Sequence, residues 1–270
     1  MPKPSSAKRC VRRSSPGAEG SARRVGVARL LSKRGHCSRS RGAEWVQQGR
    51  VRVDGQLVHD PEHPCQETAI LSLDGVRLVA ETRLVLMLNK PRGLITTASD
   101  EQGRATVYDC LGAWRERHLG PVGRLDKASE GLLLFCNDPA FAATLTDPAR
   151  HVPKTYHVQI DRLPDADLLA SLMRGVLIEG APWRVQQARE LRRGTRHAWL
   201  EIVLHEGRNR HIRRLLEALD VGVLRLLRVA IGDLWLGDLP KGAVRVLSAA
   251  EIDQLSTYST TSSPKPDKPR

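Results

Sequence analysis

The run of apolar residues at Leu132–Cys136 constrains the fold of this chain more than any other stretch. It is short and lies between Gly131 and the turn-forming pair Asn137-Asp138, so its length and flanks predict a buried strand. Asp126 precedes this strand on a polar loop, with an arginine two positions before it and a lysine directly after it. Such cations keep a half-shielded carboxylate ionised, as a nucleophile or base requires. The competing interpretation of so short a motif is an ordinary surface ion pair.

Composition bounds the class of protein. A chain of 270 residues is long enough for two domains with tails. No apolar run approaches the roughly 18 residues that cross a bilayer, and the N-terminus lacks the apolar centre of a secretory signal. The five cysteines and nine histidines are scattered without metal-ligand spacing, so we expect no metal site. Unpaired, scattered cysteines indicate a reducing compartment, and a cytoplasmic protein is predicted.

The positive charge is concentrated in the N-terminal part of the chain. The formal net charge is +13, and residues 1–24 alone hold seven Lys/Arg against one acidic residue. This pattern predicts a polyanionic partner such as RNA. Residues 1–24 and 256–270 have few large apolar side chains and are predicted to be disordered tails. We interpret the first tail as a basic RNA-contacting arm, with a mitochondrial transit peptide as the open alternative.

Residues 25–83 are predicted to form a small domain of two helices and a hairpin. One short helix contains Val27, Leu30 and Leu31, and a second is capped by Ser38. The hairpin turns at Asp54-Gly55. Basic residues crowd the helix junction and the hairpin, and we expect six of them to contact RNA: Lys33, Arg34, Arg39, Arg41, Arg50 and Arg52.

The run from Gly35 to Arg39, followed by the run from Gly49 to Gly55, resembles the small RNA-binding domain of the fourth small-subunit ribosomal protein. Asp54 stands where that pattern usually has Asn. The resemblance implies binding of structured RNA through phosphates and shape rather than through base edges.

Residues 84–255 are predicted to form a second domain. Strands are expected at residues 84–88, 154–160 and 199–204, a helix is expected to start at Asp165 or Asp167, and another is expected to be capped by Asn209. On the wheel of this last helix, Arg213 lies at the border of the apolar face. A semi-buried guanidinium needs an anionic partner, and we expect that partner to be Asp126.

Three stretches of this domain together resemble the pseudouridine synthases of ribosomal RNA. They are Lys90-Pro91-Arg92-Gly93, the loop from Gly123 to Gly131, and Lys154-Thr155-Tyr156, which precede the basic run at 208–214. The resemblance implies an α+β fold, in which the small RNA-binding domain precedes a catalytic domain with a curved, mostly antiparallel sheet. It implies catalytic roles for Asp126, Tyr156 and Arg213, and RNA contacts by Lys90, Arg92, Arg124, Lys154, Arg208, Asn209 and Arg210. Many members have Gln where this chain has His211, so the role of that position stays open.

The resemblance implies an enzyme that isomerises one uridine of ribosomal RNA, with a leaning toward the large subunit, to pseudouridine. The base would be flipped out and stacked on Tyr156, and Asp126 would act as nucleophile or base at the ribose. No cofactor or metal is expected, and the partner would be ribosomal RNA or a pre-ribosomal particle bound by a monomer. Two alternatives are weighed: a non-catalytic RNA-binding assembly factor, and a nucleotide hydrolase with an aspartate nucleophile, which would need a metal or phosphate cradle.

Overall fold

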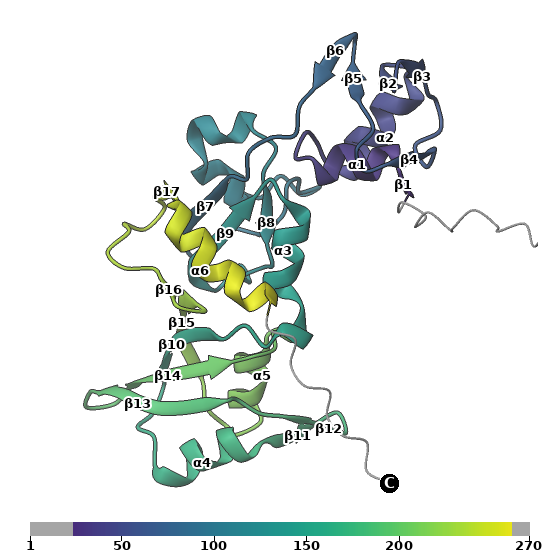
Figure 1. Cartoon of the computed structure of the whole chain (residues 1–270). Coiled ribbons are helices and arrows are strands. Elements are labelled where there is room, and N and C mark those ends of the chain that lie inside the picture. Colours follow the sequence, from purple (N-terminus) through teal and green to yellow (C-terminus); the bar gives the residue numbers. More distant parts are fainter. Residues whose placement is uncertain (1–23, 261–270) are drawn as a thin grey trace, which may run out of the picture.

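The computed structural model describes residues 24–260. The expectation of a disordered tail at residues 1–24 therefore lies outside the described residues, apart from Arg24, which starts the first strand. The described chain contains a small domain at one end and a larger domain built on one long sheet (Figure 1). No helix among the described residues is long and apolar enough to cross a membrane.

The small domain consists of two helices and short strands around one core. Helix α1 spans Val27–Lys33 and α2 spans Arg39–Gln47, with the Ser38 side chain accepting a hydrogen bond from the Arg41 N–H as the predicted cap. Strands β2, β3, β5 and β6 form a four-stranded sheet, and β1 pairs with β4. The bounds of these strands are Arg24–Gly26 (β1), Val51–Val53 (β2), Gln56–Leu57 (β3), Pro64–Gln66 (β4), Leu71–Leu73 (β5) and Val76–Leu78 (β6).

The large domain is an α+β unit with a nine-stranded sheet. The strand order is β13-β14-β10-β15-β9-β7-β17, with β16 on β15 and β8 on β9. All neighbours are antiparallel except β15 and β9, so the predicted mostly antiparallel sheet is confirmed. The strands are Val85–Lys90 (β7), Gly120–Val122 (β8), Glu130–Cys136 (β9), Lys154–Ile160 (β10), Gln187–Arg193 (β13), Ala198–Leu204 (β14), Val223–Ile231 (β15), Leu234–Trp235 (β16) and Val244–Val246 (β17). Val176–Ile178 (β11) and Ala181–Trp183 (β12) form a separate hairpin.

Helices cover the sheet at both ends. Helices α3 and α6 pack near β7 and β9, whereas α4 and α5 cover the half of the sheet around β10 and β14 (Figure 1). Their bounds are Pro139–Thr146 (α3), Ala166–Arg174 (α4), His211–Glu217 (α5) and Ala249–Thr260 (α6), and three short 3-10 helices span Val107–Cys110, Gly112–Glu116 and Pro148–Arg150. The predicted cap at Asp165 is confirmed, because its side chain accepts a hydrogen bond from the Leu168 N–H.

Two expectations about helix ends are wrong. Helix α5 starts at His211, and its cap position is Arg210 in a left-handed conformation, so Asn209 is not the cap. Helix α6 continues to Thr260, so the C-terminal tail does not begin at residue 256. The Tyr258 hydroxyl donates a hydrogen bond to the Asp233 carboxylate, which ties the end of α6 to the turn before β16.

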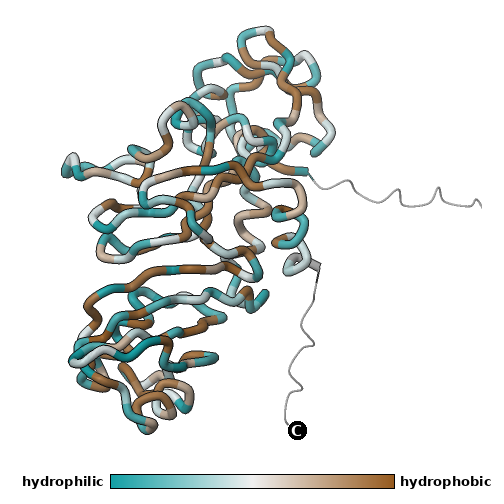
Figure 2. The backbone as a smooth tube through the Cα atoms, turned by 90° about the vertical axis from the view of Figure 1, so that its left-hand side faces the viewer, coloured by the Kyte–Doolittle hydropathy of each residue, from teal (hydrophilic) through white to brown (hydrophobic). Residues whose placement is uncertain are grey.

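Strands β7 and β9 are buried on both faces, which explains why their sequences are continuous apolar runs instead of alternating ones. Every residue of β9 is buried. On one face Met87 and Leu134 join a core that reaches α3 and α6, and on the other Leu88 and Phe135 pack under the 3-10 segments. Brown apolar stretches follow the backbone through this part of the molecule in Figure 2. The loop that carries Asp126 therefore leads into the most deeply packed strand of the sheet.

Candidate active site

The loop of Asp126 lies between β8 and β9, and it is held at its main chain. The Ser129 N–H donates to the Asp126 carbonyl at 2.9 Å, and the Gly93 N–H donates to the Lys127 carbonyl at 2.7 Å. The Thr96 hydroxyl donates to the Leu125 carbonyl at 2.7 Å. These hydrogen bonds hold backbone atoms of the loop, so they do not depend on the side chains of the loop. The half-buried Asp126 side chain faces a cavity.

Lys90, the last residue of β7, is the central support of this loop. Its side chain is fully buried, and its ammonium donates to the carbonyls of Pro91 (3.1 Å), Asp126 (3.2 Å) and Ser129 (2.9 Å). Burial lowers the pKa of Lys90 to about 8. The expectation that Lys90 contacts RNA is corrected, because a buried ammonium that already serves three carbonyls cannot reach a phosphate.

Gly131 joins the loop to β9 in a conformation that only glycine adopts without strain. Its φ is +100°, and a Cβ there would lie 2.2 Å from the carbonyl oxygen of Arg228 on β15. This close approach is the parallel contact between β9 and β15, where Gly131 is the Cα partner of Arg228. The two halves of the sheet meet at this point, beside the Asp126 loop.

A second anchor follows directly at Glu130. Its buried carboxylate accepts hydrogen bonds from Arg225 on β15 and from Lys241 in the loop before β17, at 3.0 and 2.6 Å. Burial alone would raise the pKa of Glu130, but these two cations lower it below its ordinary value. The ion triad fixes the start of β9 against β15.

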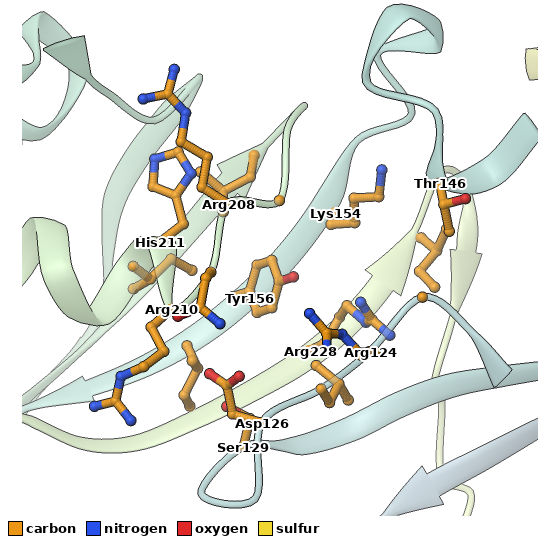
Figure 3. A pocket seen from close by; sticks show the side chains of 18 of the residues that line it. Arg124, Asp126, Ser129, Thr146, Lys154, Tyr156, Arg208, Arg210, His211 and Arg228 are labelled. Carbon is orange, nitrogen blue, oxygen red and sulfur yellow. The ribbon is translucent and has the colours of Figure 1, made fainter. Parts of the chain in front are cut away.

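The structure brings Asp126 and Tyr156 to one cavity of about 300 Å³. Tyr156 lies on β10 and is the Cα partner of Arg228 on β15, and both side chains line the cavity. Figure 3 shows the Tyr156 ring above Asp126, with Lys154 on the other side of the ring. Apolar side chains complete the wall: Val122, Leu145, Leu204, Ile212, Leu226 and Ile231. A flat ring beside a carboxylate in an apolar cavity suits an aromatic ligand.

Arg213 lies close to this site but not in the expected contact. Among the described residues no ion pair joins it to Asp126; its guanidinium donates to the carbonyls of Ala128 (3.1 Å) and Val223 (3.3 Å). Burial is the main cause of the lowered pKa of Arg213, and the charge of Asp126 partly opposes it. Arg213 therefore supports the Asp126 loop through the backbone.

The start of α5 forms the outer rim of the cavity, where Arg208, Asn209 and Arg210 are exposed. His211 is buried edge-on against Trp183, with 5.0 Å between ring centroids. Neither of its ring nitrogens has a hydrogen-bond partner within the described residues. The backbone of Arg184 lies near enough to raise the pKa of His211, but it is the last of the causes. Burial dominates and lowers the pKa of His211, so the ring is a neutral packing group at the rim.

The other expected RNA-binding residues differ in what they contact. Arg34 is half-buried and donates to the carbonyls of Glu67 and Ala69, both at 2.7 Å. Arg39, Arg92 and Arg124 are exposed. The remaining four basic residues of the small domain stay at the surface with partners nearby: Lys33 with Glu67, Arg41 with Glu44, Arg50 with Asp74, and Arg52 with the Gly55 carbonyl.

Arg228 is the lining residue that the sequence reasoning missed. It is 5% exposed and reaches the cavity from β15. The available signal was a charged residue inside the otherwise apolar run from Leu226 to Ile231. A buried strand tolerates such a residue only where its charge has a use or a partner.

Comparison with known proteins identifies the family. Residues 84–218 match the family model described as RNA pseudouridylate synthase, and residues 26–71 match the S4 domain. The chain belongs to the RNA pseudouridine synthase family and carries an N-terminal S4 RNA-binding domain. It is an isomerase, so the alternatives of a non-catalytic assembly factor and a nucleotide hydrolase are wrong.

Individual relatives are similar over most of the chain. Ribosomal large subunit pseudouridine synthase B of Yersinia pestis is 39% identical over 226 residues, which cover 81% of this chain and 70% of the relative. The protein of the same name from Bacillus subtilis is 31% identical over 231 residues, covering 85% and 94%. A crystal structure of a pseudouridylate synthase superposes with a TM-score of 0.59 at 26% identity, covering 86% of this chain and 99% of the other.

Proposed function

We propose that this enzyme converts one uridine of large-subunit ribosomal RNA to pseudouridine, with Asp126 acting at the ribose and Tyr156 stacking under the base. The single observation that carries the proposal is that a loop carboxylate and a tyrosine ring from separate elements line one cavity. The choice of the large subunit is supported by the relatives from Yersinia pestis and Bacillus subtilis, whose names state that target.

The chemistry needs an extruded base, because the glycosidic bond of a stacked uridine is out of reach of a side chain. The cavity has a volume in the range of small-ligand sites, and its apolar wall excludes water from the base. Stacking on Tyr156 holds the uracil while the C1′–N1 bond breaks and the C5 atom turns toward C1′. Asp126 either attacks C1′ or removes the proton from C2′, and both routes need it ionised.

Arg213 is a positioning residue in this proposal. Its hydrogen bond to the Ala128 carbonyl holds the loop two residues after Asp126, and its positive charge favours the ionised carboxylate across the intervening space. It thus assists Asp126 without a direct ion pair.

RNA outside the cavity would run over its exposed rim, which is formed by Arg124, Arg208, Asn209 and Arg210, and over the exposed Arg92 after β7. The S4 domain extends this surface with Lys33, Arg39, Arg41, Arg50 and Arg52. A monomer acting on ribosomal RNA or a pre-ribosomal particle in the cytoplasm is the simplest arrangement that uses both surfaces.

Two experiments test the proposal. Asp126→Asn should lower single-turnover pseudouridine formation in a large-subunit RNA transcript by at least ~10³-fold, because the acting group is removed. Its RNA affinity should stay within about threefold of wild type, which is under 1 kcal/mol. Asp238→Asn, the same change at an exposed site, is the matched control and should keep full activity.

The second experiment maps pseudouridine in ribosomal RNA from cells that lack the protein. One missing modification in the large subunit names the target uridine. An unchanged large-subunit map, or full activity of Asp126→Asn, contradicts the proposal.

A further inference from the structure

Two cations, Lys154 and Arg228, line the cavity beside Tyr156. Lys154 is two residues before Tyr156 on β10, and Arg228 faces Tyr156 from β15. Figure 3 shows Lys154 across the Tyr156 ring from Asp126, whereas Arg228 lies beside the ring, next to Arg124. The cavity therefore holds two cations and one carboxylate around an aromatic platform.

Neither Lys154 nor Arg228 has a counterion among the described residues. The Arg228 Nε donates to the Leu132 carbonyl at 2.8 Å, but its buried Nη2 has no partner within residues 24–260. The Lys154 ammonium makes no hydrogen bond or ion pair to any described residue, and burial together with the charge of Arg228 lowers the pKa of Lys154 to about 8. Charges shielded from water are normally paired, so a buried arginine and a half-buried lysine that face one cavity suit an anionic ligand.

No charge-neutralising side chain lies nearby. Among the described lining residues of the cavity, Asp126 is the sole carboxylate. The other titratable groups near Lys154 are His205, after β14, and His151, before β10, whose rings lie 5.9 Å apart. Burial, His151 and Lys154 all lower the pKa of His205, so this neighbourhood supplies no negative charge to Lys154.

Lys154 and Arg228 are less exposed than the arginines at the mouth of the cavity, which are placed to bind phosphates. Arg124, Arg208 and Arg210 line the same cavity but are exposed at its mouth, where the RNA backbone would pass. Arg228 is buried and Lys154 is half-buried, and both line the cavity with the Tyr156 ring. A base stacked on that ring would bring its carbonyl oxygens toward them.

We propose that Lys154 and Arg228 form an anion subsite that binds a carbonyl oxygen of the uracil, O2 or O4, when negative charge develops on the base. This inference rests on the proposed function, since it assumes that uridine enters the cavity. It assigns Lys154 as a catalytic residue, with Arg228 as its partner at the same oxygen.

The chemistry follows from the bond that breaks. When C1′–N1 cleaves heterolytically, both electrons leave with N1, and resonance spreads the charge to O2 and O4. Asp126 meanwhile either forms an ester with C1′ or takes the C2′ proton. The anionic uracil then bonds to C1′ through C5, which releases Asp126 as a carboxylate or returns the C2′ proton. C5 loses its proton and N1 gains one, so the step is an isomerisation that needs no external reagent. Preorganised cations lower the cost of the intermediate anion.

The test compares Lys154→Met and Lys154→Arg with Arg196→Met, an exposed control that also loses one positive charge. Single-turnover rates are measured on a large-subunit RNA fragment with uridine or 5-fluorouridine at the target site. Fluorine at C5 withdraws electrons and makes the uracil a better leaving group. The reaction is followed as loss of the original nucleoside, and RNA affinity is measured in parallel.

Lys154→Met should react ~100-fold more slowly than wild type with uridine, as expected for loss of one preorganised donor. Its RNA affinity should remain within about threefold. The defect should shrink severalfold with 5-fluorouridine, because a stabilised leaving group depends less on Lys154. Lys154→Arg should recover most of the rate, and Arg196→Met should behave as wild type.

Three outcomes would overturn the subsite. A defect of the same size with both nucleosides would show a structural role, and equal losses in affinity and rate would move the ligand to a backbone phosphate. Full activity of Lys154→Met would remove the role altogether. A wild-type enzyme that makes no pseudouridine in any ribosomal RNA would instead refute the proposed function, so the two failures are distinguishable.

Discussion

The two walls of the cavity differ in how far their polar groups are satisfied. On the wall of Asp126, Lys90 serves three backbone carbonyls and Arg213 two. On the wall of Tyr156, Nη2 of Arg228 and the Lys154 ammonium lack partners among the described residues. On the first wall only the buried Nε of Arg213 is left without a partner within residues 24–260, and the loop is held by backbone oxygens. In the proposed mechanism the protein thus fixes Asp126 in advance, and the cations of the second wall are paired by the bound uracil.

The largest expected effect tests the contact that joins the walls. Gly131→Ala should lower the free energy of unfolding by about 3 kcal/mol or more, because a Cβ there meets the Arg228 carbonyl and φ is +100°. Gly93→Ala is the matched control, with the same φ but open space around it, and should cost about 1 kcal/mol. Denaturant unfolding measures both, and equal losses would mean that β9 and β15 are not in close contact.

The next largest expected effect concerns Lys90, which supports the loop of Asp126. Lys90→Met should reduce the single-turnover rate ~100-fold, since a loop displaced by about 1 Å misplaces Asp126. Stability should change little, because removing a costly buried charge offsets the loss of its three hydrogen bonds. RNA affinity should stay near wild type. A variant that keeps its rate would show that the other loop contacts suffice.

The pH dependence of the single-turnover rate tests the lysine of each wall, Lys90 and Lys154. Burial lowers the pKa of Lys90 and of Lys154 to about 8, so each is charged below that pH and neutral above it. The single-turnover rate should therefore fall about fivefold for each lysine between pH 8 and 9, or about 25-fold for the two together. Of the other groups facing Lys154, which are Arg228, His151 and His205, burial lowers the pKa of His205, so that ring does not titrate between pH 8 and 9. Lys154→Arg keeps its charge, so the fall that remains reports Lys90 alone.

The smallest effect concerns the rim. Burial lowers the pKa of His211, so below pH 6.5 the unfolded chain binds the proton more readily and stability falls as pH decreases. His211→Gln should reduce this acid destabilisation by less than about 1 kcal/mol between pH 6.5 and 5. Burial also lowers the pKa of His118, so His118→Gln serves as a comparison away from the cavity. Thermal melts at both pH values measure this difference. If the fall in stability from pH 6.5 to 5 is the same in His211→Gln as in wild type, His211 is protonated in the folded protein.

Much of the fold was predictable because it follows from local sequence patterns. The apolar run at 132–136 identified the central strand, and the Ser38 and Asp165 caps identified helix starts. Asp126 and Tyr156 were found through short motifs, and the structure places both in one cavity.

What the sequence did not predict depends on contacts between distant elements. Lys90 looks like a surface residue at a strand end, yet the loop 36 residues later closes over it. Arg213 reaches Ala128 across 85 residues, and no local pattern indicates that it bonds a carbonyl instead of a carboxylate. Arg228 gains its place in the site from its pairing with Tyr156 on another strand.

The hydrogen bonds of Lys90 and Arg213 to backbone carbonyl oxygens have an evolutionary consequence. Every amino acid offers the same oxygen, and the Gly93 N–H binds the Lys127 carbonyl in the same way, so the side chains at Lys127 and Ala128 are free to change without displacing the carboxylate beside them. Descendants of this enzyme can therefore adapt to a different RNA contour at those two positions while inheriting the reaction intact.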